Sequence, residues 1–255
     1  MVSLLQTTGD TKLGVLASTA LALSNIFALR GGKPNLEEHI DLILNRVPQT
    51  ALDALRARHG NSRWKKYLDL RHQIRRNILV CHRIGLVDAP RQKVLDIACG
   101  GGIFIYCARY FGHDSIGIDV ENALLVEIAK VLNVDRRIER VVPFKPLAIS
   151  GSFDLIACMN PTFDRYNSGK RHWRWGVQEW RFFIADLADR LAPAGRIFLR
   201  INRGDQARCE GTYYYDARVH QALLPGHLWR NEYLLDHNKL SDAIARLNKI
   251  ELADR

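Results

Sequence analysis

The stretch KVLDIACGGGI, residues 93–103, places three consecutive glycines directly after a short apolar segment that contains an acid. The apolar residues of 93–98 predict a strand, and the residues after the glycines predict a helix that ends at Gly112. Glycine has no Cβ, so at such a turn the backbone can bend sharply and a ligand can approach closely. The free N–H groups at the start of the helix would point to the same place. One or two glycines suffice for a tight turn, so the third indicates a ligand-binding loop.

Short apolar segments alternate with helical patterns from residue 91 onward. Further strands are predicted at 115–120, 140–144, 153–159, 195–202 and within 226–235, and helices at 121–133, 179–193 and 240–250. This alternation indicates an α/β fold, a Rossmann-like, doubly wound and mostly parallel sheet with helices on both faces. Such sheets bind ligands at the carboxyl ends of their strands, which is where the glycines lie.

Residues 1–90 have a different pattern, which predicts an N-terminal helical extension ahead of a Rossmann-like domain at 91–255. Its helices are predicted from their caps: one from the capping box of Asn35 and Glu38 to Pro48, one from Thr50 to Gly60, and one from Ser62 to Gly85. The uncharged segment 13–29 has 17 residues and several polar ones, at the lower limit for crossing ~30 Å of hydrocarbon. We expect it to form a buried or amphipathic helix, so membrane association is not expected.

Positive charge is concentrated in the helical extension. The chain carries a net charge of +10, and residues 54–83 contain nine basic residues and one acidic residue. In the third predicted helix one stripe is apolar (Tyr67, Leu70, Ile74, Ile78 and Cys81), and the opposite stripe is basic (Lys65, His72, Arg76 and Arg83). The basic stripe is either a solvated surface or a guide for a polyanionic partner such as nucleic acid.

The five cysteines show no CxxC pair, and their number is odd: Cys81, Cys99, Cys107, Cys158 and Cys209. This pattern argues against a disulfide framework and against a zinc site, and no metal is expected. It is typical of a reducing compartment, so a cytoplasmic protein is expected.

Two kinds of nucleotide ligand could use the glycine loop. A dinucleotide fingerprint, G-x-G-x-x-G, would need a third glycine where Ile105 stands. It would also place the carboxylate of Asp96 close to a pyrophosphate, whereas a carboxylate suits a ligand that carries a cation. A nicotinamide-dependent reductase therefore stays an alternative only.

The residues Asp96-x-Ala98-x-Gly100-x-Gly102 resemble motif I of class I S-adenosylmethionine-dependent methyltransferases, D/E-x-G-x-G-x-G, with Ala98 in place of the first glycine. Asp119 ends the second predicted strand, 23 residues after Asp96, and matches the acid of the family that binds the ribose. Residues 153–159 match motif IV, and 191–202 match the strand that follows it. The segment WGVQEWRFF, 175–183, is similar to a poorly characterised bacterial-type group of the family.

The resemblance implies that S-adenosylmethionine is the cofactor and that 91–255 is the catalytic domain. It places Asp96 near the methionine ammonium, Asp119 at the ribose and Val120 beside the adenine. The other cofactor-binding positions that it implies are Ala98, Cys99, Gly100, Gly101, Gly102 and Met159. Members of the family often have an acid after the third strand for the adenine amino group; the segment 143–151 contains none, so the adenine contact stays open.

The loop after the fourth predicted strand is where this family binds its acceptor. Its candidate catalytic residues are Asn160, Asp164 and His172. Asn160-Pro161-Thr162-Phe163 is similar to the (D/N)-P-P-(Y/F) motif of enzymes that methylate planar amino groups, with Thr162 in place of a proline. The aromatic and basic residues between 163 and 183 suit an aromatic or anionic acceptor. Trp173 and Trp175 are expected at the pocket, whereas Trp180 and Phe183 are expected to pack the following helix onto the sheet.

The expected function is methyl transfer to a small acidic or aromatic molecule, with the helical extension as a cap over the site. Two alternatives stay open: amino-group methylation of nucleic acid or protein, and a non-enzymatic basic binding module with a methyltransferase-like fold. The oligomeric state is not predicted.

Overall fold

The computed structural model describes residues 35–168, 171–201 and 217–253. Residues 35–46 belong to one compact unit, and the residues from 47 onward belong to a second. The first unit contains helix α2 (Leu36–Leu44). Its predicted capping box is confirmed, since Asn35 Oδ1 accepts from the Glu38 N–H at 3.1 Å and Glu38 Oε2 accepts from the Asn35 N–H at 2.8 Å.

The second unit is built on a sheet of seven strands within the described residues, which confirms the predicted Rossmann-like fold class. Along the sheet the order is β3 (Asp135–Ile138), β2 (Asp114–Asp119), β1 (Lys93–Ile97), β4 (Phe153–Met159), β7 (Leu191–Arg200), β9 (Glu232–Leu235) and β8 (His227–Trp229). The first five strands are parallel, and β9 and β8 continue the sheet as an antiparallel hairpin. The segment 226–235, for which one strand was predicted, therefore contains two.

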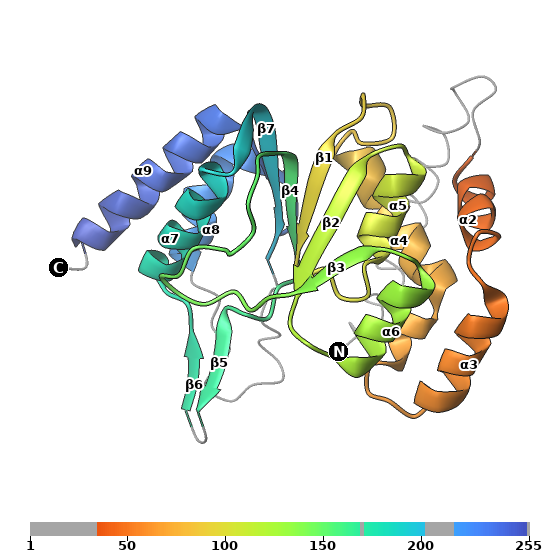
Figure 1. The fold of residues 1–255 in the computed structure, drawn as a ribbon. Helices are drawn as coiled ribbons and strands as arrows, with labels where there is room; N and C mark the ends of the chain where they lie inside the picture. Colours follow the sequence, from red (N-terminus) through yellow and green to blue (C-terminus); the bar gives the residue numbers. More distant parts are fainter. Residues whose placement is uncertain (1–34, 169–170, 202–216, 254–255) are drawn as a thin grey trace, which may run out of the picture. The chain divides into compact units, whose positions relative to one another are not determined.

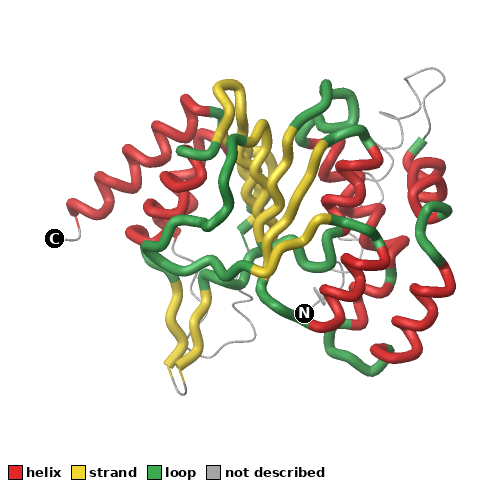
Figure 2. Tube along the Cα trace, viewed as in Figure 1, coloured by secondary structure: helices red, strands yellow, loops and turns green. Residues whose placement is uncertain are grey.

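Helices cover both faces of the sheet (Figures 1 and 2). On one side lie α3 (Gln49–His59), α4 (Leu70–Arg83), α5 (Ile103–Tyr110) and α6 (Ala123–Val131), and on the other lie α7 (Val177–Ala188), α8 (Ala217–Leu223) and α9 (His237–Ala253). A short 3-10 turn, η2 (Leu224–Gly226), joins α8 to β8. A separate hairpin, β5 (Arg165–Ser168) and β6 (Arg171–Arg174), follows β4. The strand residues Leu95, Ile97, Phe153 and Ile156 are fully buried, so the core lies between the sheet and its two helical layers.

The third predicted helix is not continuous, which corrects the sequence-based prediction. A 3-10 turn, η1 (Lys65–Leu68), precedes α4, and the N-cap of α4 is Asp69, whose Oδ1 accepts from the His72 N–H at 3.1 Å. An aspartate whose side chain binds a backbone N–H in this way starts a helix rather than continuing one. The predicted cap at Thr50 is also wrong, because α3 begins one residue earlier, after Pro48, with no side-chain cap.

The third strand lies at 135–138 and not at the predicted 140–144. It is an edge strand, and three of its four residues are exposed, so it does not need the apolar sequence of a central strand. The apolar residues at 141–143 line a cavity instead, as described below.

Two further sequence predictions concern a membrane-spanning helix and the state of the cysteines. In the described part of the chain, no helix combines the length and hydropathy needed to cross a membrane; the segment 13–29 lies outside this part. Buried free thiols are Cys81, Cys99, Cys107 and Cys158, and Cys209 is outside the described residues.

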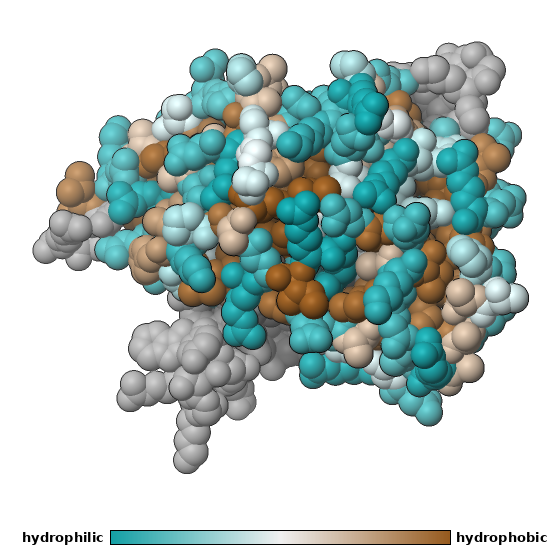
Figure 3. All heavy atoms as spheres, viewed as in Figure 1, coloured by the Kyte–Doolittle hydropathy of each residue, from teal (hydrophilic) through white to brown (hydrophobic). Residues whose placement is uncertain are grey.

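On the face seen in Figure 3, hydrophobic side chains reach the surface near β3. The exposed apolar residues include Val120, Ile138, Val142 and Phe144.

Candidate functional site

The glycine loop connects β1 to α5 at the carboxyl edge of the sheet. Three of its residues have left-handed backbone conformations: Ala98 (φ 60°), Gly100 (φ 59°) and Gly102 (φ 76°). A Cβ on Gly102 would lie 2.5 Å from Val134 Cγ2, so both the backbone angle and the packing require glycine there. The sequence thus turns into α5 through this loop, whose first residue, Ala98, lines the cavity described below.

Asp119, at the end of β2, holds this loop. Its Oδ2 accepts from the Gly100 N–H and its Oδ1 from the Val120 N–H, both at 2.7 Å. Burial raises the pKa of Asp119, and the two N–H donors and the charge of Arg136 oppose that rise. The structure therefore brings together the predicted motif I and the predicted ribose acid.

Asp96 is a buried carboxyl group beside the same loop, with 1% of its surface exposed. Burial, and then the charge of Asp119, raise the pKa of Asp96 well above its ordinary value. Among the described residues its Oδ1 has no hydrogen-bond partner. Two acids so close together, one of them with an unsatisfied oxygen, suit a ligand that brings a positive charge and N–H donors.

Two residues that the sequence did not point to also reach the glycine loop. Tyr67 of η1 lies against it, with Cε1 3.7 Å from the position of a Cβ on Gly100. Burial raises the pKa of Tyr67 and the charge of Asp119 adds to this rise, so the helical extension contributes to the site. Arg136 of β3 donates to the Gly100 carbonyl at 2.8 Å. Both contacts join segments more than 30 residues apart, and no local sequence pattern signals them.

A cavity of about 510 Å³ opens beside Asp119. Its lining comes from four strand ends and the helix α7: Ala98, Ile118, Asp119, Val120, Glu139, Arg140, Val141, Val142, Pro143, Thr162, Phe163, Trp175 and Glu179. Phe163 packs on Trp175 with ring centroids 5.0 Å apart, which gives the cavity an aromatic wall. Trp175 is thus at the pocket as predicted, and Trp180 and Phe183 are buried in the core as predicted.

Glu139 is an acid directly after the third strand, a position that the sequence-based prediction of this strand does not give. It follows β3 directly and lines the cavity, and its Oε1 accepts from the Ala148 N–H at 2.5 Å. A third strand at 140–144 predicts the acid within 143–151, where the sequence has none. The correct strand position would have revealed it.

The candidate acceptor residues are less closely gathered. Asn160 follows β4 with a left-handed backbone (φ 52°), and its N–H donates to the Arg200 carbonyl at 2.7 Å. Asp164 is buried, and its carbonyl accepts from the Trp175 N–H at 3.0 Å. Neither belongs to the lining of the cavity, nor does the half-buried Met159. His172 has its backbone in β6, and its side chain lies outside the described part of the chain.

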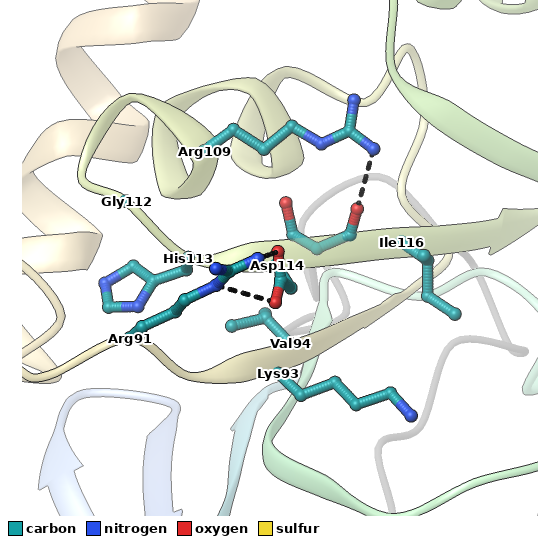
Figure 4. A pocket seen from close by; sticks show the side chains of 9 residues that line it. Arg91, Lys93, Val94, Arg109, Gly112, His113, Asp114 and Ile116 are labelled. Carbon is teal, nitrogen blue, oxygen red and sulfur yellow. Dashed lines mark hydrogen bonds and ion pairs between the residues drawn. The ribbon is translucent and has the colours of Figure 1, made fainter.

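A second hollow, of about 550 Å³, lies at the amino ends of β1 and β2 (Figure 4). Most of its charged groups are already engaged: Arg91 forms a two-point ion pair with Asp114, and Arg109 donates to the Ser115 carbonyl. His113 Nε2 is hydrogen-bonded to the Leu86 carbonyl. This hollow lies at the opposite edge of the sheet from the glycine loop, so the cavity that Ala98 and Asp119 line at the carboxyl edge is the better candidate site.

One member of the predicted basic stripe is not a free surface charge. Arg83 forms an ion pair with Glu232, which is 2% exposed, and Arg200 donates to the same carboxylate from the other side at 2.7 and 2.8 Å. His72 and Arg76 are exposed, as predicted. The stripe is therefore shorter than the sequence indicated.

Comparison with known proteins gives partial matches. No family model matches the chain. It is 34% identical over 109 residues to a ubiquinone biosynthesis O-methyltransferase of Acinetobacter baylyi, a match that covers 38% of this chain and 43% of the relative. It is 34% identical over 73 residues to the ubiquinone biosynthesis O-methyltransferase of Bordetella avium, which covers 27% of this chain and 30% of the relative. The chain thus matches less than half the length of these curated relatives.

Solved structures with a similar arrangement include CalS10, an amino pentose methyltransferase from Micromonospora echinaspora bound to S-adenosylmethionine (TM-score 0.38, 22% identity, 51% of each chain). Another is an S-adenosylmethionine-dependent methyltransferase from Clostridium acetobutylicum (TM-score 0.41, 15% identity, 55% of this chain and 56% of that one). The curated matches, both named methyltransferases, agree with the resemblance to class I S-adenosylmethionine-dependent methyltransferases that motif I carries at residues 93–103.

Proposed function

We propose that this chain transfers the methyl group of S-adenosylmethionine to a small acidic or aromatic acceptor in the cavity at the carboxyl edge of the sheet. The observation that carries the proposal is that the buried Asp96 and the half-buried Asp119 lie beside the left-handed glycine loop. A ligand with a cationic amino acid end and a ribose satisfies both acids.

Each part of S-adenosylmethionine has a matching residue or group of residues at the site. Asp96 accepts from the methionine ammonium, which supplies the donor that its Oδ1 lacks among the described residues. Asp119 accepts from the ribose hydroxyls, because each carboxylate oxygen has lone pairs beyond the one used by a backbone N–H. The adenine lies between Val120 and the apolar residues that follow β3, with Glu139 as the acceptor for its amino group.

Bound S-adenosylmethionine supplies an already activated methyl group, so the main task of the protein is to align the acceptor with it. Thr162 and Phe163 line the cavity directly after β4, and Trp175 continues the aromatic wall. Flat aromatic walls hold an aromatic acceptor at a fixed angle to the methyl group.

The curated relatives are named O-methyltransferases, which favours an oxygen acceptor here. A hydroxyl acceptor is protonated and needs a base, and Asp164 and His172 are the residues that we propose for this role. Amino-group methylation is the second candidate. Residues 160–163 are similar to the motif of enzymes that methylate planar amino groups, and two of them, Thr162 and Phe163, line the cavity.

The test begins with calorimetric titration of the purified chain with S-adenosylmethionine, S-adenosylhomocysteine and NADP. We expect the first two to bind and NADP not to bind; binding of NADP alone would contradict the proposal. Transfer of a labelled methyl group is then measured on phenols, carboxylic acids, glutamine-containing peptides and single-stranded RNA and DNA. Transfer to peptides or nucleic acid would favour the amino-group alternative, and cofactor binding without any transfer would favour a binding module.

The nucleic acid outcome has its own control. Binding that depends on the basic stripe falls steeply with salt, and the combined change of Lys65 and Arg76 to Gln flattens that dependence. Arg83 is left unchanged in this variant, because it pairs with the buried Glu232 and its loss would disturb the fold.

A further inference from the structure

Arg136 and Asp119 hold the same two peptide segments from opposite sides. The N–H groups of Gly100 and Val120 both donate to the Asp119 carboxylate. The carbonyls of the same two residues both accept from Arg136, Gly100 O from Nε at 2.8 Å and Val120 O from Nη2 at 2.6 Å. Gly100 belongs to the glycine loop and Val120 to the end of β2, so this ring of four hydrogen bonds joins two walls of the cofactor site.

The guanidinium group is suited to this place by its shape. It presents N–H donors in a rigid planar fork, so one side chain can bind two carbonyls without losing much conformational freedom. The Gly100 backbone is left-handed and lies outside any helix or strand, so no regular hydrogen-bond ladder fixes the direction of its carbonyl. Arg136 supplies that constraint from the neighbouring edge strand.

We infer that Arg136 is a positioning residue for the cofactor: by binding the Gly100 and Val120 carbonyls it holds the glycine loop in its binding shape, and it provides the positive charge beside the ribose carboxylate. This inference rests on the proposed function, since it assigns Arg136 a part in the binding of S-adenosylmethionine.

The charge of Arg136 has a measurable consequence for Asp119. The titratable and charged groups that face Asp119 come from five elements: Asp96 from β1, Cys99 from the loop, Tyr67 from η1, Cys158 from β4 and Arg136 from β3. Burial raises the pKa of Asp119, and Arg136 is the cation that lowers it. The carboxylate form accepts both ribose hydroxyls, so binding weakens as pH falls through this pKa. Loss of Arg136 raises the pKa, and binding is then lost at a higher pH.

The experiment compares three variants of the full chain: Arg136→Met, Arg136→Lys and the matched control Arg137→Met. Arg137 is the next residue on β3, so its side chain points to the other side of the strand. This side chain is exposed, and its Nη2 lies 3.6 Å from Asp135 Oδ2. The affinity for S-adenosylhomocysteine is measured by calorimetry between pH 5 and pH 9, and folding is checked by circular dichroism and thermal unfolding.

We expect Arg136→Met to bind about tenfold or more weakly at neutral pH, with its acidic loss of binding moved to a higher pH than in the parent. Arg136→Lys restores the charge, and with it the position of the acidic loss, but not the full affinity, because an ammonium group lacks the planar fork. Arg137→Met behaves as the parent does. A role in folding alone would change stability without moving the pH profile of binding.

The outcomes separate this inference from the proposed function. If the parent does not bind S-adenosylhomocysteine, the proposed function is wrong. If the parent binds and Arg136→Met shows the affinity and pH profile of Arg137→Met, the inference about Arg136 is wrong while the function stands. If Arg136→Met does not fold, Arg136→Lys decides, because parent-like affinity in that variant would contradict the role of the fork.

Discussion

Asp119→Asn is the substitution that tests the cofactor site most directly. In the parent, the two carboxylate oxygens accept the N–H groups of Gly100 and Val120, each at 2.7 Å. Asparagine keeps the shape of the side chain and replaces one of these acceptors with an NH₂ donor. One backbone N–H then faces a donor, and the bound ribose loses a charged acceptor.

The size of the effect follows from these hydrogen bonds. A hydrogen bond to a charged group contributes about 1.5–3 kcal/mol, so the affinity for S-adenosylhomocysteine should fall by about 10- to 150-fold. The ligand-free chain loses less, because burial has already raised the pKa of Asp119 and the neutral amide avoids that desolvation. Calorimetry at neutral pH measures the first effect, and urea unfolding measures the second.

Asp114→Asn is the matched control, because Asp114 lies at the amino end of the same strand, is exposed and pairs with Arg91. This variant should bind S-adenosylhomocysteine as the parent does. If Asp119→Asn also binds as the parent does, or if both variants lose affinity equally, the placement of the ribose at the end of β2 is refuted.

Three further substitutions test other features of the site and its support. Asp96→Asn should make the ligand-free chain more stable than the parent at high pH and equally stable at low pH. Burial and the charge of Asp119 raise the pKa of Asp96, so the parent loses stability as pH rises through that pKa. Urea unfolding at a series of pH values measures the difference in the free energy of unfolding. Ala98→Gly should raise the urea midpoint, since a left-handed alanine costs about 1–2 kcal/mol and the added chain entropy of glycine about 0.4–1 kcal/mol; an unchanged or lower midpoint contradicts this. Glu232→Gln should lower the free energy of unfolding by about 3–5 kcal/mol, because Arg83 and Arg200 lose the buried carboxylate that they share. A loss below about 1 kcal/mol would show that these ion pairs are solvated.

The parts of the fold that were predicted correctly are those whose sequence reflects burial on both faces. The strand at 153–159 was predicted with its observed bounds, and the strand at 93–98 differs by one residue. Central parallel strands are covered on both sides, so they are continuous apolar runs that can be recognised from the sequence. The glycine loop was also predictable, since the glycines and the left-handed backbone that requires them lie in the same short segment.

The edge of the sheet was not predictable in this way. The residues of β3 are mostly polar, because one of its sides pairs with β2 and the other has no neighbouring strand. The nearest apolar run, 140–144, lies beside the cavity and not in the sheet. An apolar segment that lines a ligand cavity and an apolar segment that forms a buried strand have the same sequence pattern, so the strand and the acid after it, Glu139, were both missed.

The structure also changes the meaning of the basic composition. Within the described residues, three arginines each donate to two backbone carbonyls: Arg109 to Asn133 and Ser115, Arg136 to Gly100 and Val120, and Arg190 to Leu147 and Ile149. A guanidinium group can do this because it has five N–H donors in one plane and keeps its charge.

Part of the net charge of +10 is therefore used inside the fold, where arginine side chains fix the loops between strands and helices. Counting these residues as a surface for a polyanionic partner overstates that surface. The argument for nucleic acid as an acceptor then depends on cations such as Lys65 and Arg76, which are exposed. The argument for a small acceptor depends on the cavity beside Asp119, which has an aromatic wall of Phe163 and Trp175 and a limited volume of about 510 Å³.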